Sequence, residues 1–165
     1  MKNYFMLSVI CLAVALAGCS TFHEPTPTTT TTTLPAHTFI GVSLGDTTAD
    51  VVAVLGQPES TDTEFDILAY EWDSLERAVI FQLPTTEVVA VISANGADEL
   101  NGIKPGIHEA HVRTLLGDAD QVKTGSLTYM WVYSRYNIIV SFYLSDNTCV
   151  GVVLYWPGRF DIDPE

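Results

Sequence analysis

The sequence Gly45-Asp-Thr-Thr-Ala-Asp-Val-Val-Ala-Val-Leu-Gly-Gln-Pro58 predicts one short helix with both of its ends marked. Thr47 is a preferred N-cap residue, and Asp50, three residues later, favours the helix N-terminus as in a capping box. Apolar residues follow at the i, i+3, i+4 spacing of a buried helix face, at Val51, Val54 and Leu55. Gly56 and Pro58 end the helix, because glycine favours the position after a helix and proline cannot continue it.

The same pattern returns in Gly106-Ile-His-Glu-Ala-His-Val-Arg-Thr-Leu-Leu-Gly-Asp-Ala119. At an offset of 61 residues, Gly41–Ser93 aligns with Gly102–Leu154 without a gap, and 12 pairs are identical. The matches fall on turn glycines and on helix and strand positions, as a structural repeat requires. We therefore interpret 41–93 and 102–154 as two copies of one unit.

Each copy continues with three predicted strands, in which apolar residues alternate with other residues. The expected strands are Leu68–Asp73, Ala78–Leu83 and Val88–Ser93, then Tyr129–Ser134, Ile138–Leu144 and Cys149–Trp156. One helix over three strands buries little apolar surface by itself, so the copies should share a sheet. We expect an α+β fold, in which two tandem α-β-β-β repeats form one antiparallel sheet with the helices packed on one face. The domain would span 39–158, followed by an acidic tail, 159–165.

The N-terminal sequence predicts an export signal. Lys2 precedes an apolar run from Met6 to Ala17, which is shorter than the roughly 20 residues of a membrane-spanning helix. The run ends in Leu16-Ala17-Gly18-Cys19, which resembles the lipobox of bacterial lipoproteins. The resemblance implies that the signal 1–18 is removed between Gly18 and Cys19 and that Cys19 carries lipid. Residues 19–38 are then a lipidated, Thr/Pro-rich linker, whose prolines favour an extended chain.

The expected localisation is the cell envelope, through the lipid anchor. Ser20, rather than aspartate, follows the lipidated cysteine, which by resemblance to Gram-negative sorting rules implies the outer membrane. The chain has 20 acidic and 7 basic residues and a net charge of −13. This charge argues against general nucleic-acid binding, which needs a basic surface, so we expect no nucleic-acid partner. The acidic charge suits basic patches on a partner protein.

Residues 45–58 also resemble the opening of the BamE (SmpA/OmlA) family of small outer-membrane lipoproteins, which serve the β-barrel assembly machinery. The shared features are the glycine, the capping threonine, the helical valine and the Leu-Gly-x-Pro ending. A tandem copy of such a module is similar to the β-lactamase-inhibitor-protein fold and to uncharacterised YjgB-like secreted proteins. The second copy departs from the BamE pattern, with His108 at the cap and no proline after Gly117. The resemblance implies a role in envelope assembly or in recognition of a secreted enzyme.

Catalytic and metal-binding motifs are weak in this sequence. His108 and His111 are one residue short of the His-Glu-x-x-His spacing, and no third ligand is evident. Cys149 aligns with Val88 of an apolar strand, so we expect a buried thiol. The acidic pairs Asp118/Asp120 and Asp161/Asp163 lack the glycine and distal glutamate of a calcium loop. We expect no catalytic residue, no metal and no cofactor.

Aromatic residues concentrate in the predicted strands. Period two places Tyr70 with Trp72, and Trp131 with Tyr133, on common faces. They form either a partner-binding surface on an uncovered sheet face or a core of cross-strand pairs. The expected function is a non-enzymatic lipoprotein that binds an unidentified envelope protein. The alternative is a lipoprotein that binds a small ligand, a glycan or a metal.

Overall fold

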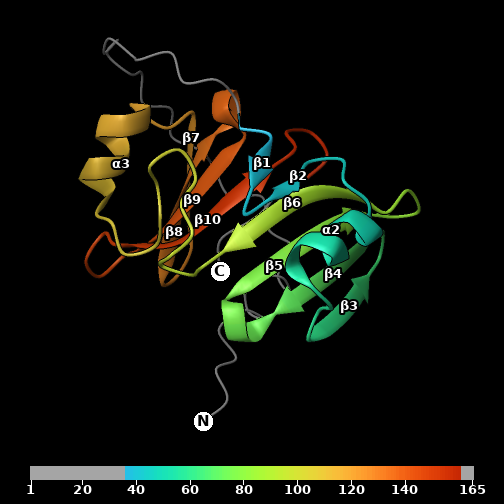
Figure 1. Cartoon of the computed structure of the whole chain (residues 1–165). Helices are drawn as coiled ribbons and strands as arrows, with labels where there is room; N and C mark the ends of the chain where they lie inside the picture. Colours follow the sequence, from blue (N-terminus) through green and yellow to red (C-terminus); the bar gives the residue numbers. More distant parts are fainter. Residues whose placement is uncertain (1–35, 161–165) are drawn as a thin grey trace.

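The computed structural model describes residues 36–160. Eight antiparallel strands form one sheet in the order β3-β4-β5-β6-β10-β9-β8-β7 (Figure 1). Its first half contains β3 (Ser60–Glu64), β4 (Ile67–Trp72), β5 (Arg77–Gln82) and β6 (Glu87–Ser93). Its second half contains β7 (Gln121–Thr124), β8 (Thr128–Tyr133), β9 (Ile138–Tyr143) and β10 (Cys149–Tyr155). A ribbon of β1 (Thr38–Phe39) and β2 (Val42–Ser43) precedes the sheet. The helices are α2 (Thr48–Leu55) and α3 (Glu109–Leu116), with 3₁₀ turns η1 (Asp73–Leu75) and η2 (Ser134–Tyr136).

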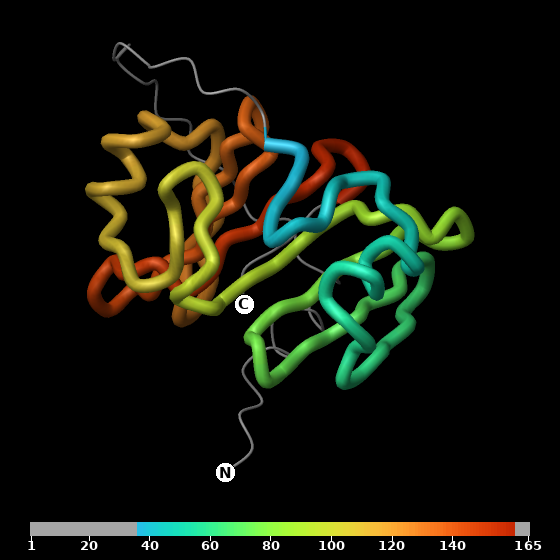
Figure 2. Tube along the Cα trace, viewed as in Figure 1, coloured from blue at the N-terminus to red at the C-terminus, as the bar shows by residue number. Residues whose placement is uncertain are grey.

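The elements of the two halves recur at an offset of 61 residues. The bounds of α2, β4, η1 and β5 map onto those of α3, β8, η2 and β9 without a shift. The halves lie side by side and join through β6 and β10, which pair from Val152↔Ser93 to Tyr155↔Ala90 (Figure 2). One continuous sheet therefore contains both copies.

The expected α+β class is wrong, because the fold is mostly β. Each helix has eight residues, about two turns, and cannot form a layer over eight strands. Each half also has a fourth strand, β3 or β7, that the sequence analysis missed. The sequence of β3 is Ser-Thr-Asp-Thr-Glu, which has no apolar alternation and is exposed throughout. Such polar strands suit the sheet edges, where charged side chains discourage pairing with other chains.

The predicted capping box of α2 is confirmed. The Thr47 hydroxyl accepts from the Asp50 backbone N–H at 3.4 Å, and an Asp50 carboxylate oxygen accepts from the Thr47 backbone N–H at 2.9 Å. Hydrogen bonds from Thr47 hold the pKa of Asp50 below its usual value. The cap of α3 is simpler, since Nδ1 of His108 accepts from the Ala110 N–H at 3.2 Å. Both helices therefore begin where the sequence predicts.

The two helices lie on one face of the sheet, here called the covered face (Figure 1). Val51 of α2 and Val112 and Leu116 of α3 pack there against strand side chains. Gly41, with φ of +83°, lets the turn before α2 approach that helix, since a Cβ there would lie 2.9 Å from Val54 Cγ1. Among the described residues no helix is long and apolar enough to span a membrane.

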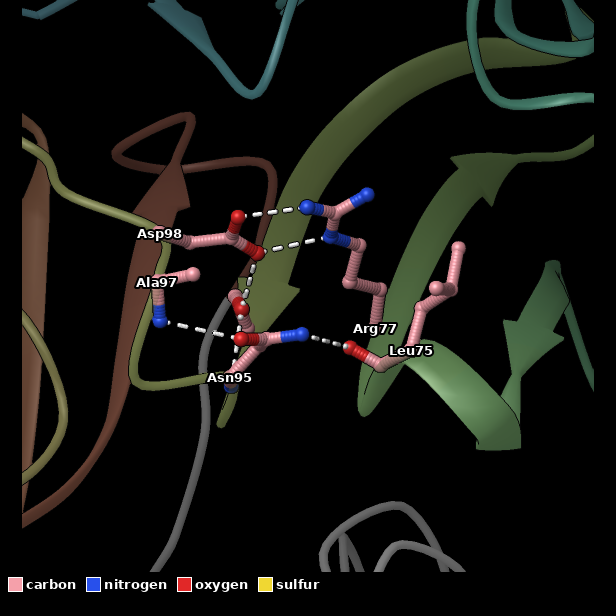
Figure 3. Close-up of polar contacts among 6 residues, drawn as sticks. Leu75, Arg77, Asn95, Ala97 and Asp98 are labelled. Carbon is pink, nitrogen blue, oxygen red and sulfur yellow. Dashed lines mark hydrogen bonds and ion pairs between the residues drawn. The ribbon is translucent and has the colours of Figure 1, made fainter.

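A buried polar cluster ties the linker between the halves to the sheet (Figure 3). Nη2 and Nε of Arg77 donate to the two oxygens of Asp98 at 2.5 and 2.6 Å. The Ser93 hydroxyl also donates to Asp98, at 2.6 Å. Burial acts to raise the pKa of Asp98, but the hydrogen bonds from Arg77 and Ser93 outweigh it and hold that pKa below its usual value. This cluster anchors the linker that connects the first copy to the second.

Candidate functional site

The opposite side of the sheet, here called the second face, is an apolar surface that crosses both copies. It consists of Ala69, Ala78, Ile80, Val89, Ala90, Ile92, Met130, Val132, Ile139, Val153 and Tyr155. These side chains are all buried. Among the hydrophobic residues of 36–160 that lie outside the sheet, Phe160, after β10, packs against them. The described residues place no layer of helices or strands over this face.

Polar side chains border the second face at both edges of the sheet. Ser60, Asp62 and Glu64 of β3 lie opposite Glu71, Ala69 and Ile67 of β4, so they share that face. Gln121 and Lys123 of β7 lie opposite Val132 and Met130 in the same way. The arrangement is an apolar centre with a polar rim, and it is acidic along the β3 edge. That composition is typical of a protein–protein interface.

A hollow of about 450 Å³ lies at the β7–β8–β9 end of the second face. Val132, Ile139 and Tyr155 line it from the sheet, and Arg159 and Phe160 line it from the C-terminal turn. The guanidinium of Arg159 stacks 4.4 Å from the ring of Trp156 and pairs with Glu87 at 2.8 Å. These contacts hold the turn beside the sheet.

The aromatic residues singled out from the sequence lie on the covered face instead. Trp72, Trp131 and Tyr133 are buried, and Tyr70 is partly buried against the same core. Tyr70 packs edge-on against Phe81, with ring centroids 4.9 Å apart, and Trp131 packs against Phe142 at 5.0 Å. The aromatic residues therefore form a core of cross-strand pairs, the second of the two alternatives given in the sequence analysis. A partner-binding surface has to be built from other residues.

Polar contacts from the second copy hold its aromatic residues in place. The Tyr133 hydroxyl donates to the Gly117 carbonyl at 3.2 Å, and burial raises the pKa of that phenol. The Arg113 guanidinium lies 4.9 Å from the Trp131 ring centroid. Tyr129 donates to Glu109 at 2.7 Å, and burial, then that hydrogen bond, raises its pKa. These are helix-to-sheet contacts within the core.

The other candidate residues have structural surroundings. His108 and His111 are exposed, and residues 36–160 contain no group of three His, Cys, Asp or Glu side chains that could hold a metal. Cys149 is buried, and burial raises the pKa of its thiol to about 12. Asp118 and Asp120 lie 3.6 and 3.5 Å from Arg113 and Arg135. Gly18, Cys19, Asp161 and Asp163 lie outside the described residues.

Sequence reasoning missed the second face as a whole, including its buried acid Glu71. Glu71 is 3% exposed and follows Ala69 on the face opposite to the aromatics. The sequence did hold a signal for this face. The segment Ala78-Val-Ile-Phe81 is apolar at every position, so its side chains are apolar on both faces of the sheet. A strand that is apolar on both sides is buried on both faces, or needs a cover on the second.

Comparisons with known proteins bear on the fold. The sequence matches no protein-family model and no curated protein. The structure is similar to the DUF4309 family protein YjgB from Bacillus subtilis, with 19% identity, a TM-score of 0.45, and coverage of 66% of this chain and 77% of that chain. YjgB-like proteins are among those named in the sequence analysis, whereas the BamE-like module stays a prediction.

Two further structures share the fold at higher TM-scores. One is an extracellular protein containing a SCP domain from Bacillus anthracis, with a TM-score of 0.51, 11% identity, and coverage of 81% of this chain and 50% of that chain. The other is the cysteine-rich secretory protein SAV1118 from Staphylococcus aureus, with a TM-score of 0.54, 12% identity, and coverage of 75% of this chain and 47% of that chain. This chain spans about half the length of these two proteins.

Proposed function

We propose that this protein is a lipid-anchored component of the bacterial envelope that binds a partner protein, without catalysis, through the second face. The observation that carries the proposal is the apolar sheet face with its polar rim, over which the described residues place no helix or strand. A contiguous apolar face with a polar rim is a common feature of protein interaction sites. An eight-stranded sheet presents it as a rigid, preorganised platform.

The sequence supports the anchor. Cys19 follows a short apolar run, and 18 linker residues could extend to about 55 Å at the polyproline rise, so the domain could act well away from the membrane surface. In a Gram-negative host, Ser20 favours the outer membrane and a role in envelope assembly. Metabolic labelling with an alkyne fatty acid tests the anchor, since Cys19→Ala should abolish the label. Retention of the label in that variant would contradict it.

The partner is tested by photo-crosslinking in the native host. A diazirine amino acid is placed at Ile67 or Thr128, which occupy matching positions on the second face at the ends of β4 and β8. The control position is Val54, which is 50% exposed on α2 at the covered face. We expect one dominant product from Ile67 and Thr128 and little from Val54. An equal or greater yield from Val54 would contradict the proposal.

The hollow beside Phe160 supports a second candidate function, the binding of a small ligand or glycan. Its lining combines Tyr155 and Phe160 with Gln121, so it could stack a ring and hydrogen-bond to it. A thermal-shift screen of envelope glycans against the purified chain tests this function. A ligand that raises the melting temperature of the wild type but not of Phe160→Ala would favour it over protein recognition.

A further inference from the structure

The tip of the β3–β4 hairpin presents a large apolar side chain to solvent. The hairpin forms one edge of the sheet (Figure 1), and Glu64 pairs with Ile67, so the loop between its strands is Phe65-Asp66. Phe65 is 84% exposed, more than any other large apolar side chain of residues 36–160. Single exposed apolar residues are common, but this one also occupies an unfavourable backbone position.

Phe65 has a left-handed backbone that the fold does not require. Its φ is +51°, a value that is costly for a bulky residue. In a two-residue hairpin loop, a positive φ at the first position alone is typical of glycine. The other left-handed non-glycine residues of the described part form pairs 61 positions apart, namely Ile40/Asn101, Glu76/Asn137 and Thr86/Asn147. At the position that matches Phe65, the second copy has Ser126, which is not left-handed.

Hydrogen bonds from the end of β5 hold this loop in place. Nε2 of Gln82 donates to the Asp66 carboxylate at 2.8 Å and to the Asp66 carbonyl at 3.2 Å. The Leu83 backbone N–H donates to the same carbonyl at 2.7 Å. An aromatic side chain on a fixed loop loses little conformational freedom on binding, so it suits the role of an interface anchor.

The hairpin and the copy that carries it are acidic. Three exposed acids surround the tip, Asp62, Glu64 and Asp66. Residues 36–96 contain 10 acidic residues and 1 basic residue, whereas the matching range 97–157 contains 6 and 4. The basic residue of the first range, Arg77, is paired with Asp98. The acidic charge is therefore concentrated around the exposed phenylalanine, where it favours a partner surface that carries basic residues.

We propose that Phe65 is an anchor that inserts into an apolar pocket of a partner protein, whose rim presents Lys or Arg side chains to the acids of the hairpin. This role goes beyond the proposed function, because the exposure of the tip does not depend on what covers the second face. A lipid surface is a less suitable partner, since acids beside the tip repel anionic headgroups. A second copy of this chain is also less suitable, because all four arginines of residues 36–160 already have acidic partners.

Photo-crosslinking followed by calorimetry tests the anchor. Benzoylphenylalanine replaces Phe65 in the full chain in the native host, and mass spectrometry identifies the captured protein and its labelled residue. The control position is Leu127, which is 76% exposed at the second hairpin and matches Asp66 in the repeat. Calorimetry then measures the affinity of the purified captured protein for the wild type, for Phe65→Ser and Phe65→Gly, and for the control Leu127→Ser.

We expect position 65 to label one protein, at a site beside Lys or Arg, and position 127 to give little product. Phe65→Ser and Phe65→Gly should each weaken binding by about tenfold or more, as the loss of an aromatic anchor does. Leu127→Ser should change the affinity by less than about twofold. Phe65→Gly should melt at or above the wild-type temperature, because glycine adopts a positive φ without strain, so its lost affinity is not lost folding.

The acids of the hairpin are tested by the double variant Asp62→Asn/Glu64→Gln. We expect it to weaken binding by about threefold at low salt, and by less at about 0.5 M salt, because salt screens exposed charges. An affinity that is unchanged at low salt would contradict the basic rim of the pocket.

Other results would overturn the anchor itself. It fails if position 65 labels no protein, labels lipid, joins two copies of this chain, or labels a site without Lys or Arg. It also fails if Phe65→Ser binds as the wild type does, or if Phe65→Gly melts at a lower temperature, which would give Phe65 a structural role. A product from Thr128 but not from position 65 would overturn the anchor and leave binding through the second face in place. A product from position 65 but not from Thr128 would support the anchor and contradict the second face.

Discussion

The two copies have the same backbone but differ in how their buried polar groups are satisfied. In the second copy the Tyr133 hydroxyl reaches the Gly117 carbonyl. At the matching position of the first copy, Nε1 of Trp72 is buried without a partner. Its neighbour Glu71 contributes the other unsatisfied buried atom found among the described side chains. Both orphaned atoms thus belong to adjacent residues of β4.

Comparing the copies distinguishes features that the fold requires from features that are specific to one copy. Left-handed residues occur in both copies at matching positions, including Glu76 and Asn137, where the 3₁₀ turns end. Glu59 and Asp120 likewise accept from the backbone N–H groups of Ser74 and Arg135. Shared features of this kind are architectural. Glu71 has no such counterpart, and unmatched buried polar groups are where we expect function to lie.

The largest expected effect concerns the matched core residues Phe81 and Phe142, both 0% exposed. We expect Phe81→Ala and Phe142→Ala each to lower the free energy of unfolding by about 3–5 kcal/mol. Because β6 pairs with β10, each variant should still unfold in one transition. Calorimetry checks both points. Two separate transitions in either variant would show that the copies fold independently.

The junction between the copies should give the next largest effect. Asp98→Asn weakens the bidentate pair with Arg77, and we expect a loss of about 2 kcal/mol near neutral pH. The pKa of Asp98 is lowered in the folded chain. Its contribution is therefore fully present above the unfolded pKa of about 3.9 and is lost as pH falls through the folded pKa. Urea unfolding at several pH values should show wild type and variant converging in acid; a constant gap would contradict the assignment.

The helix caps offer a smaller test of the comparison. Thr47→Ala removes both the hydroxyl acceptor for the Asp50 N–H and the hydroxyl donor to its carboxylate, and should cost about 1 kcal/mol. His108→Ala removes one bond of 3.2 Å and should cost less. Chemical denaturation of the two variants measures the difference. An equal or larger loss from His108→Ala would mean that the simpler cap is not the weaker one.

The smallest effect, and one of opposite sign, is expected from copying the second repeat into the first. Glu71→Val should raise the free energy of unfolding by up to about 1 kcal/mol, since it removes a buried acceptor without a partner. The reverse exchange, Val132→Glu, should lower it, because Gln121 replaces the serine that supports Glu71. Thermal unfolding of the pair tests the asymmetry. Destabilisation by Glu71→Val would mean that the carboxylate is structural.

Local signals made much of the backbone predictable. Thr47 and Gly56 mark the ends of α2 by side-chain capping and by a positive φ of 82°, which depend on few neighbours. The alternation Val79, Phe81 identifies β5 in the same way. The strands β3 and β7 were missed because their polar sequences have no apolar period, and their pairing with β4 and β8 depends on tertiary contacts. Without these two strands, the sequence analysis underestimated the β content and predicted the wrong fold class.

The site was harder to predict than the fold. Tyr70 and Trp131 were singled out because they are large aromatics. A sequence shows which residues of a strand share a face, but it does not show which face the helices cover. Val51 and Val112 place the helices over the aromatic side. The second face is instead built mainly from alanine and aliphatic residues, with Met130 and Tyr155. Its one buried acid, Glu71, is distinguished by an unsatisfied oxygen, which a sequence does not show.

Oxidation of Met130 tests the central proposal, that the second face binds a partner protein, most directly. Met130 lies on that face, and it is the only methionine that remains once residues 1–18 are removed. Peroxide oxidation, followed by mass spectrometry, is compared between the purified mature chain and the same chain in intact envelopes. Met130 is 3% exposed, and we predict that it is oxidised more slowly in envelopes than in the purified chain. Equal protection in both would show that the chain covers its own second face and would contradict the account.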